Sequence, residues 1–126
     1  MSPESIDYIG TAELILSEAQ ELLEEGHNAV AAREAYLASL SAARAIIFEK
    51  TGDAPKTHSG TRAMLAKLIH DGLALDTKLL KFLADGFEMK NDSDYGSRTP
   101  LPDDEAERAL ETAQDFLAAA KRILGR

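Results

Sequence analysis

The sequence contains no cysteine and no tryptophan, and aromatic residues make up only 6% of its 126 positions. Without cysteine, disulfide frameworks, thiolate metal sites and cysteine nucleophiles are all excluded. Because large aromatic side chains are scarce, any core must be built from aliphatic residues and alanine. The lack of cysteine also fits a reducing compartment, so we expect a cytoplasmic protein.

Long apolar runs and an excess of positive charge are missing as well. The longest apolar runs, such as Ala45–Phe48, are far shorter than the roughly 18 residues of a membrane span, so no membrane insertion is expected. The N-terminus has neither the basic nor the apolar region of a signal peptide. The net charge is −8 and the isoelectric point is near 4.8, so broad electrostatic binding to nucleic acid or anionic membranes is not expected, and no DNA partner is predicted. A small local basic pocket is compatible with this charge.

The length indicates one domain over residues 1–126, and the hydrophobic periodicity is helical nearly everywhere, without β alternation. Ser2 as N-cap and Pro3 at the first helical position predict where the first helix begins. We predict helices from Pro3 to a stop at Gly26, over Asn28–Lys50, Gly60–His70 and Asp76–Met89, and from Pro102 to Leu124. The fold class is therefore all-α, an up-down antiparallel four-helix bundle with one additional short helix.

Each long helix has an apolar stripe that predicts its buried face. The stripes of the first, second and fifth helices are, in order, Ile9, Ala12, Leu16, Ala19 and Leu23; Val30, Leu37, Leu40, Arg44 and Ile47; and Ala106, Leu110, Ala113, Leu117, Ala120 and Leu124. The first helix carries further apolar residues beside its stripe, Tyr8, Ile15 and Leu22. Such a surplus commonly packs against a partner, which favours a homodimer.

Arg44 stands on the second stripe, where the period predicts an apolar residue. In one interpretation its stem packs on the core while the guanidinium reaches solvent or a carboxylate. In the other, the arginine points into a cleft between helices and holds a phosphate.

Two polar segments offer further candidates for an anion site. Lys90 lies on the face of Leu79, Leu83 and Phe87 if the fourth helix continues, and Asp94 follows one turn later, beyond Asn91. These polar residues either end the buried zone or line a cleft.

The second segment is Pro55–Gly60, where Lys56 and His58 precede the third helix. A cation and an imidazole beside a helix N-terminus suit an anion, although the same residues also suit a capping segment. The three histidines lack a His-x3-His spacing, and residues 92–96 do not match a calcium loop. We therefore expect no metal site and no cofactor.

Four segments together resemble the HEPN domain family, above all its small stand-alone prokaryotic members. They are Ala35-Tyr36, Ser41–Gly52, Pro55–Gly60 and Asn91–Gly96. The resemblance implies a helical homodimer with a cleft where the fourth helices of two subunits meet. Many such proteins are RNA-cutting toxins, and many are encoded beside a minimal nucleotidyltransferase that acts as antitoxin.

The nuclease motif of the family is an arginine followed, after four to six residues, by a histidine. Here the resemblance places Lys90 at the arginine position and Tyr95 at the histidine position. Lysine lacks the planar fork that grips phosphate, and a tyrosine with a pKa near 10 is a poor general base at neutral pH. We therefore expect nuclease activity to be weak or absent.

Three functions remain open. The first is a HEPN-type homodimer that binds nucleotide or RNA in a toxin–antitoxin-like or nucleotidyltransferase-associated module. The second is an active metal-independent ribonuclease, with Lys90 stabilising the phosphate and Tyr95 or His58 as the acid or base. The third is a non-catalytic helical interaction module. The expected ligand-binding residues are Arg44, Lys56, His58, Lys90, Asn91, Asp94 and Tyr95.

Overall fold

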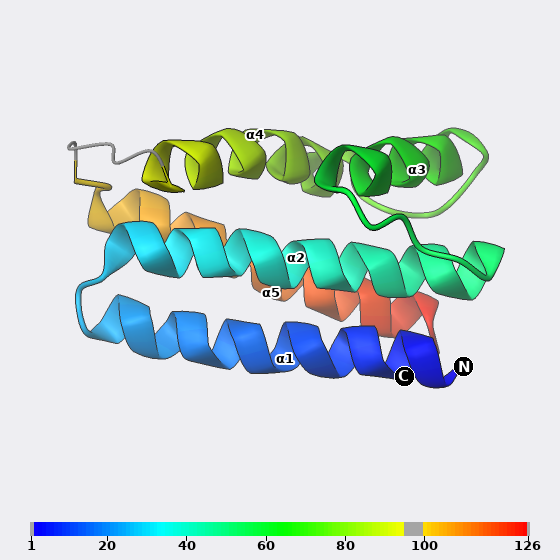
Figure 1. Ribbon diagram of the computed structural model, residues 1–126, viewed down its shortest axis with the longest axis horizontal. Helices are drawn as coiled ribbons and strands as arrows, with labels where there is room; N and C mark the ends of the chain where they lie inside the picture. The colour runs from blue at the N-terminus through cyan, green and yellow to red at the C-terminus, as the bar shows by residue number, and fades with distance from the viewer. Residues whose placement is uncertain (1, 95–99, 126) are drawn as a thin grey trace.

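The computed structural model describes the backbone of residues 2–94 and 100–125, and the side chains of residues 2–86 and 100–125. All of the regular structure in these ranges is helical (Figure 1). The elements are α1 (Pro3–Glu24), α2 (Asn28–Thr51), α3 (His58–His70), α4 (Thr77–Asp94) and α5 (Asp103–Ile123). The predicted all-α fold is confirmed.

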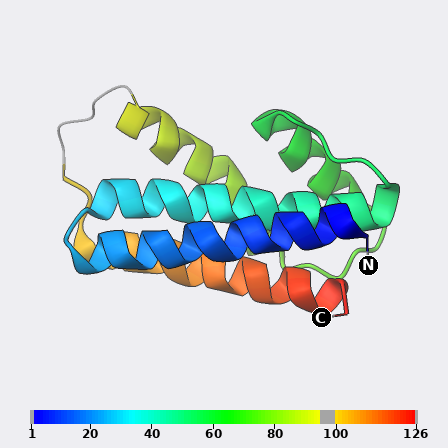
Figure 2. The same cartoon turned by 60° about the horizontal axis from the view of Figure 1, so that its bottom comes forward.

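The helix α2 is the central element of the fold. The helices α1 and α5 pack against it and against each other, while α3 and α4 lie nearly end to end across its opposite side (Figures 1 and 2). Along the chain α1, α2, α4 and α5 run in alternating directions, and α3 is the additional short helix (Figure 1). This arrangement is consistent with the predicted up-down bundle.

Local sequence signals explain most of the helix boundaries. Ser2 accepts a hydrogen bond from the Ser5 N–H at 3.1 Å, so it is the N-cap of α1 as predicted. The α2 helix ends at Gly52, whose φ of 82° is the left-handed conformation that glycine adopts without strain. The α3 helix begins at His58 and not at Gly60, because the Thr57 hydroxyl caps it by accepting the Gly60 N–H at 2.9 Å.

The fourth helix is longer than the sequence predicted. We expected it to end near Met89, but α4 continues to Asp94 and takes in the polar residues 91–94. No proline or glycine interrupts residues 87–94, so nothing in the local sequence stops the backbone from remaining helical. The polarity of this stretch therefore does not mark the end of the helix.

The core is aliphatic and rich in alanine, as the composition predicted. The predicted stripes of α1 and α5 face inward, and Leu40 and Ile47 of α2 are fully buried. Val30 is an error in the predicted α2 stripe, because its side chain is 45% exposed near the N-terminus of the helix.

The apolar surplus of α1 packs within the chain. Tyr8, Ile15 and Leu22 are half-buried against the two halves of the core, and the Tyr8 ring lies against Phe48 with 6.5 Å between centroids. These three side chains therefore give no support to a homodimer, which remains a prediction. Within the described residues, no helix combines the length and apolar character needed to cross a membrane.

Candidate functional site

A tyrosine and a histidine from different helices form the centre of the candidate site. The hydroxyl of Tyr36, in the middle of α2, lies 3.1 Å from Nδ1 of His58, the first residue of α3. Their rings are tilted by 59° with centroids 5.6 Å apart. Tyr36 is only 1% exposed, whereas His58 is half-buried, so the tyrosine is a fixed support and the imidazole stands nearer the surface.

The pKa of Tyr36 is set by its burial and by the charges of two arginines. Burial raises the pKa of the Tyr36 phenol above its ordinary value of 10.0, while the positive charges of Arg62 and Arg44 partly oppose that rise. Tyr36 is therefore protonated at neutral pH, and its hydroxyl keeps a proton for the hydrogen bond with His58. Arg62 follows His58 by one helical turn, so both residues lie on the same side of α3.

Arg44 binds the loop between α2 and α3. Its Nε donates to the carbonyl of Pro55 at 3.1 Å and to the hydroxyl of Thr61 at 3.2 Å, and its Nη2 donates to the carbonyl of Lys56 at 3.1 Å. These acceptors are neutral, so they hold the guanidinium in place without cancelling its charge. Both interpretations of Arg44 from the sequence left out backbone carbonyls as its partners. In the structure, Arg44 holds the segment that carries His58.

A glycine brings α4 directly against Tyr36. A Cβ atom added at Gly86 would overlap Cδ1 of the Tyr36 ring and lie 3.1 Å from its Cγ. Contacts this close exclude any side chain without movement of the helix or of the ring. The sequence of α4 therefore lets its backbone cover one side of Tyr36.

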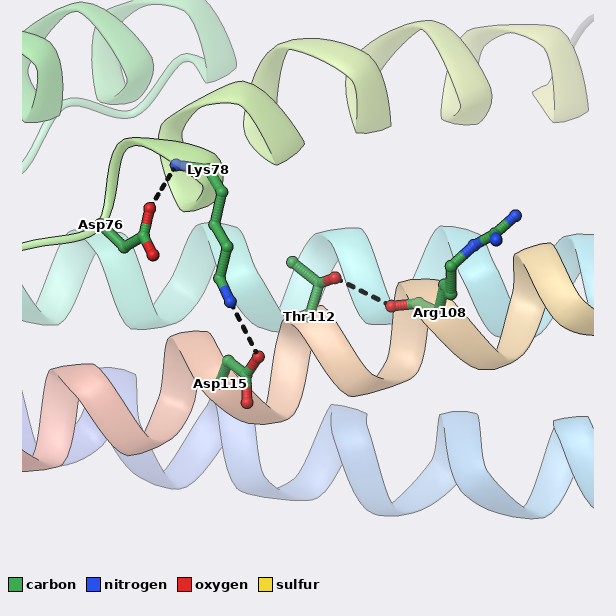
Figure 3. Close-up of polar contacts among 5 residues, drawn as sticks. All are labelled: Asp76, Lys78, Arg108, Thr112 and Asp115. Carbon is green, nitrogen blue, oxygen red and sulfur yellow. Dashed lines mark hydrogen bonds and ion pairs between the residues drawn. The ribbon is translucent and has the colours of Figure 1, made fainter.

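The first turns of α4 are also anchored to α5, as Figure 3 shows. The Lys78 ammonium lies 3.6 Å from Oδ2 of Asp115, and its backbone N–H donates to Oδ1 of Asp76 at 2.9 Å. Farther along, a hollow of about 250 Å³ opens between α4 and α5, with Phe82 on one side and Thr112 on the other. An exposed ion pair and this hollow therefore lie side by side between the two helices.

The predicted site residues fall into three groups. Arg44 and His58 both lie at the cluster around Tyr36, one holding the loop and the other bonded to the phenol. Lys56 is exposed on that loop.

The remaining candidates are not placed at the level of side chains. Lys90, Asn91 and Asp94 belong to the last turns of α4, where the structure describes the backbone alone. Tyr95 lies outside the described residues. Their proposed roles stay predictions.

Sequence reasoning did not single out two members of the cluster. Tyr36 was noted only as part of the family resemblance, and Arg62 was not noted at all. The pattern offered one usable signal, because Tyr36 lies eight residues before Arg44 on α2, about two turns away on a similar face. Among the described side chains, no three histidine or carboxylate groups gather in a way that could hold a metal ion.

Comparison with known proteins identifies the family. The model of the HEPN domain matches residues 6–123, which is nearly the whole chain and includes every helix that forms the site. A search of the curated proteins gave no match. The matched range contains all of the segments on which the resemblance in the sequence rests. The chain therefore belongs to the HEPN domain family, a helical module related at the family level to nucleotides and RNA.

Proposed function

We propose that this protein is a homodimer that binds nucleotide or RNA, with little or no nuclease activity. Its setting would be a toxin–antitoxin-like or nucleotidyltransferase-associated module in the cytoplasm of a prokaryote. The observation that carries the proposal is the hydrogen bond between the buried Tyr36 and His58, on a segment that Arg44 holds and that also carries Arg62 one turn later.

The charge balance of the cluster supports an anionic ligand. The chain as a whole carries −8, so it attracts phosphate only where cations are concentrated. Arg44 donates to neutral oxygens, and no carboxylate among the described side chains forms an ion pair with Arg44 or Arg62. The two guanidinium charges are therefore available to a phosphate.

Binding of a labelled single-stranded RNA and of labelled AMP, followed by fluorescence anisotropy, tests this proposal. We expect Arg62→Ala to weaken the affinity about tenfold, the usual effect of losing one charge-assisted phosphate contact. Arg108→Ala is the matched control, because Arg108 is an exposed arginine on α5 whose ion pair with Asp104 is 3.7 Å long. Equal affinities for both variants and the unmodified protein would contradict the proposal.

The homodimer is supported by exposed residues of α4 that lie beside its hollow with α5. Lys81 and Asp85 are both exposed and form an i, i+4 ion pair at 2.6 Å, beside the half-buried Phe82. If two α4 helices meet antiparallel, this pair is self-complementary, because Lys81 of each subunit can face Asp85 of the other. Light scattering should give twice the monomer mass of 13.6 kDa, and Phe82→Glu should shift it towards the monomer.

The cluster also gives a specific reason to test the ribonuclease function. The Tyr36 hydroxyl holds the His58 imidazole at 3.1 Å, and Arg62 follows His58 by one turn of α3, which is an arrangement suited to acid or base catalysis at a phosphate. We expect the unmodified protein to leave a fluorescent RNA intact in the presence of EDTA. Cleavage that persists in EDTA and disappears in His58→Ala would establish the ribonuclease instead.

A further inference from the structure

The outer face of α1 carries exposed apolar side chains that the bundle does not use. Leu14 is 61% exposed and Ile6 is 42% exposed, and they stand two turns apart with Gly10 between them. The spacing i, i+4, i+8 places all three on one stripe of the helix. The helix α1 itself lies on the side of α2 opposite the layer of α3 and α4 (Figures 1 and 2).

Gly10 has no structural reason to be a glycine within this chain. A Cβ atom added there would meet no atom within 4 Å, and its backbone is ordinary α-helix. Glycine inside a helix is nevertheless unfavourable relative to alanine. Gly86 shows the opposite case, since its missing side chain admits the Tyr36 ring. A bare position between two exposed apolar residues gives another helix room for a close backbone approach.

The charge of α1 restricts what can bind there. The helix carries six carboxylates and no lysine or arginine. Asp7, Glu18 and Glu21 are exposed around the stripe, and none forms an ion pair with another described side chain. A second copy of α1 would bring carboxylates against carboxylates, and a nucleic acid or anionic membrane would be repelled.

We propose that the stripe of Ile6, Gly10 and Leu14 is a docking face for an amphipathic helix of a different protein. The partner helix would bring small and apolar residues to the stripe and lysine or arginine to the surrounding carboxylates. The face lies apart from the cluster at Tyr36, so one molecule can hold a nucleotide or RNA and this partner at once. The proposal does not depend on the function proposed for that cluster.

The probe is a fluorescent synthetic peptide that forms an amphipathic helix, with alanine and leucine on one side and lysine along both edges. A second peptide has glutamate in place of every lysine. We expect the full-length protein to bind the lysine peptide, with an affinity that falls as salt is added, and to ignore the glutamate peptide. Leu14→Lys and Glu18→Lys should each weaken binding about tenfold. The control Glu107→Lys, which makes the same charge change at an exposed site on α5, should leave it nearly unchanged.

The variant Gly10→Ala separates docking from folding. It should raise the midpoint of thermal unfolding by a few degrees, because alanine favours the helix and fills open space. It should also weaken the affinity for the lysine peptide several-fold, because the added methyl group keeps the backbone of the bound helix at a greater distance.

Three results would overturn the proposal. One is equal binding of the lysine peptide by Glu18→Lys and Glu107→Lys, which would indicate attraction to the acidic surface in general. Another is unchanged peptide affinity in Gly10→Ala. The third is a fall in the solution mass of the protein in Leu14→Lys, which would identify the occupant of this face as a second copy.

Discussion

Replacing Gly86 by alanine reverses the usual effect of this substitution in a helix. Glycine to alanine in a helix interior normally stabilises a protein by about 0.5–1 kcal/mol, because the backbone of glycine loses more freedom on folding. At Gly86 the new Cβ overlaps Cδ1 of Tyr36 and lies 3.1 and 3.3 Å from the Cγ and Cβ atoms of the same side chain. The tyrosine cannot turn aside, since it is 1% exposed and hydrogen-bonded to His58.

The magnitude follows from these two opposing effects. Overpacking a closely filled core costs about 1–3 kcal/mol, which exceeds the gain in helix propensity. We therefore expect Gly86→Ala to lower the free energy of unfolding by about 1–2 kcal/mol. Gly10→Ala is the matched control, because its Cβ enters open space and only the gain remains. The gain in helix propensity is common to both, so the two alanine variants should differ by the overpacking cost, about 1–3 kcal/mol.

Urea unfolding followed by far-ultraviolet circular dichroism measures both variants in one experiment. Near-ultraviolet circular dichroism reports on the tyrosine rings and should change in Gly86→Ala but not in Gly10→Ala. A Gly86→Ala protein as stable as the Gly10→Ala protein would contradict this expectation. It would mean that α4 does not approach α2 as closely at Tyr36 as the geometry indicates.

Three further predictions concern the loop, the acid range and the nuclease motif. Arg44→Met keeps the packed stem of the side chain but loses its hydrogen bonds to the loop. The free energy of unfolding measured in urea should therefore fall by about 2 kcal/mol. An unchanged unfolding midpoint would mean that other residues hold the loop. A hydrogen bond from Ser5 lowers the pKa of Glu49 below its ordinary 4.5, so this group stabilises the fold above that pH and loses its effect as the carboxylate becomes protonated. Thermal midpoints should accordingly fall more steeply below pH 4.5 in the unmodified protein than in Glu49→Gln, and parallel curves would contradict this. The double variant Lys90→Arg, Tyr95→His has the arginine and histidine that the family resemblance implies. If base catalysis is what is missing, its rate of RNA cleavage in EDTA should exceed that of the unmodified protein by about 10²–10⁴. An inactive double variant would count against that explanation.

The sequence predicted those features of the fold that depend on periodicity and local capping. Three such features follow from interactions within a few residues along the chain. They are the α5 stripe from Ala106 to Leu124, the start of α1 at Ser2 and the end of α2 at Gly52. The prediction that Val30 is buried was wrong, because the apolar stripe was extended to the N-terminal end of α2, where the residue has no packing partner. The extension of α4 was missed because polarity was taken as the end of a helix.

The candidate site was less accessible to sequence reasoning, because its contacts join distant parts of the chain. Tyr36 and His58 are 22 residues apart, and their hydrogen bond exists only because α3 packs across the middle of α2. Arg44 was recognised as an anomaly on an apolar stripe, but its carbonyl partners lie in a loop whose path no periodicity describes. In the sequence, Gly86 is only a residue that lowers helix stability, and its role follows only from its contact with Tyr36. Such residues are identified by the packing of helices, which a pattern along one helix does not contain.

The attachment of α3 has a consequence for how the molecule opens. Among the described helices, α3 packs on α2 and α4 only, whereas α1, α2 and α5 pack on one another. Separation of α3 and its loop from α2 therefore leaves the three long helices intact, and this local opening requires less free energy than global unfolding. Backbone amides of α3 should exchange with deuterium before those of α1 and α2. Any ligand that bridges His58 or Arg62 to α4 would slow that exchange, so hydrogen exchange in α3 can report ligand binding without a label on the ligand.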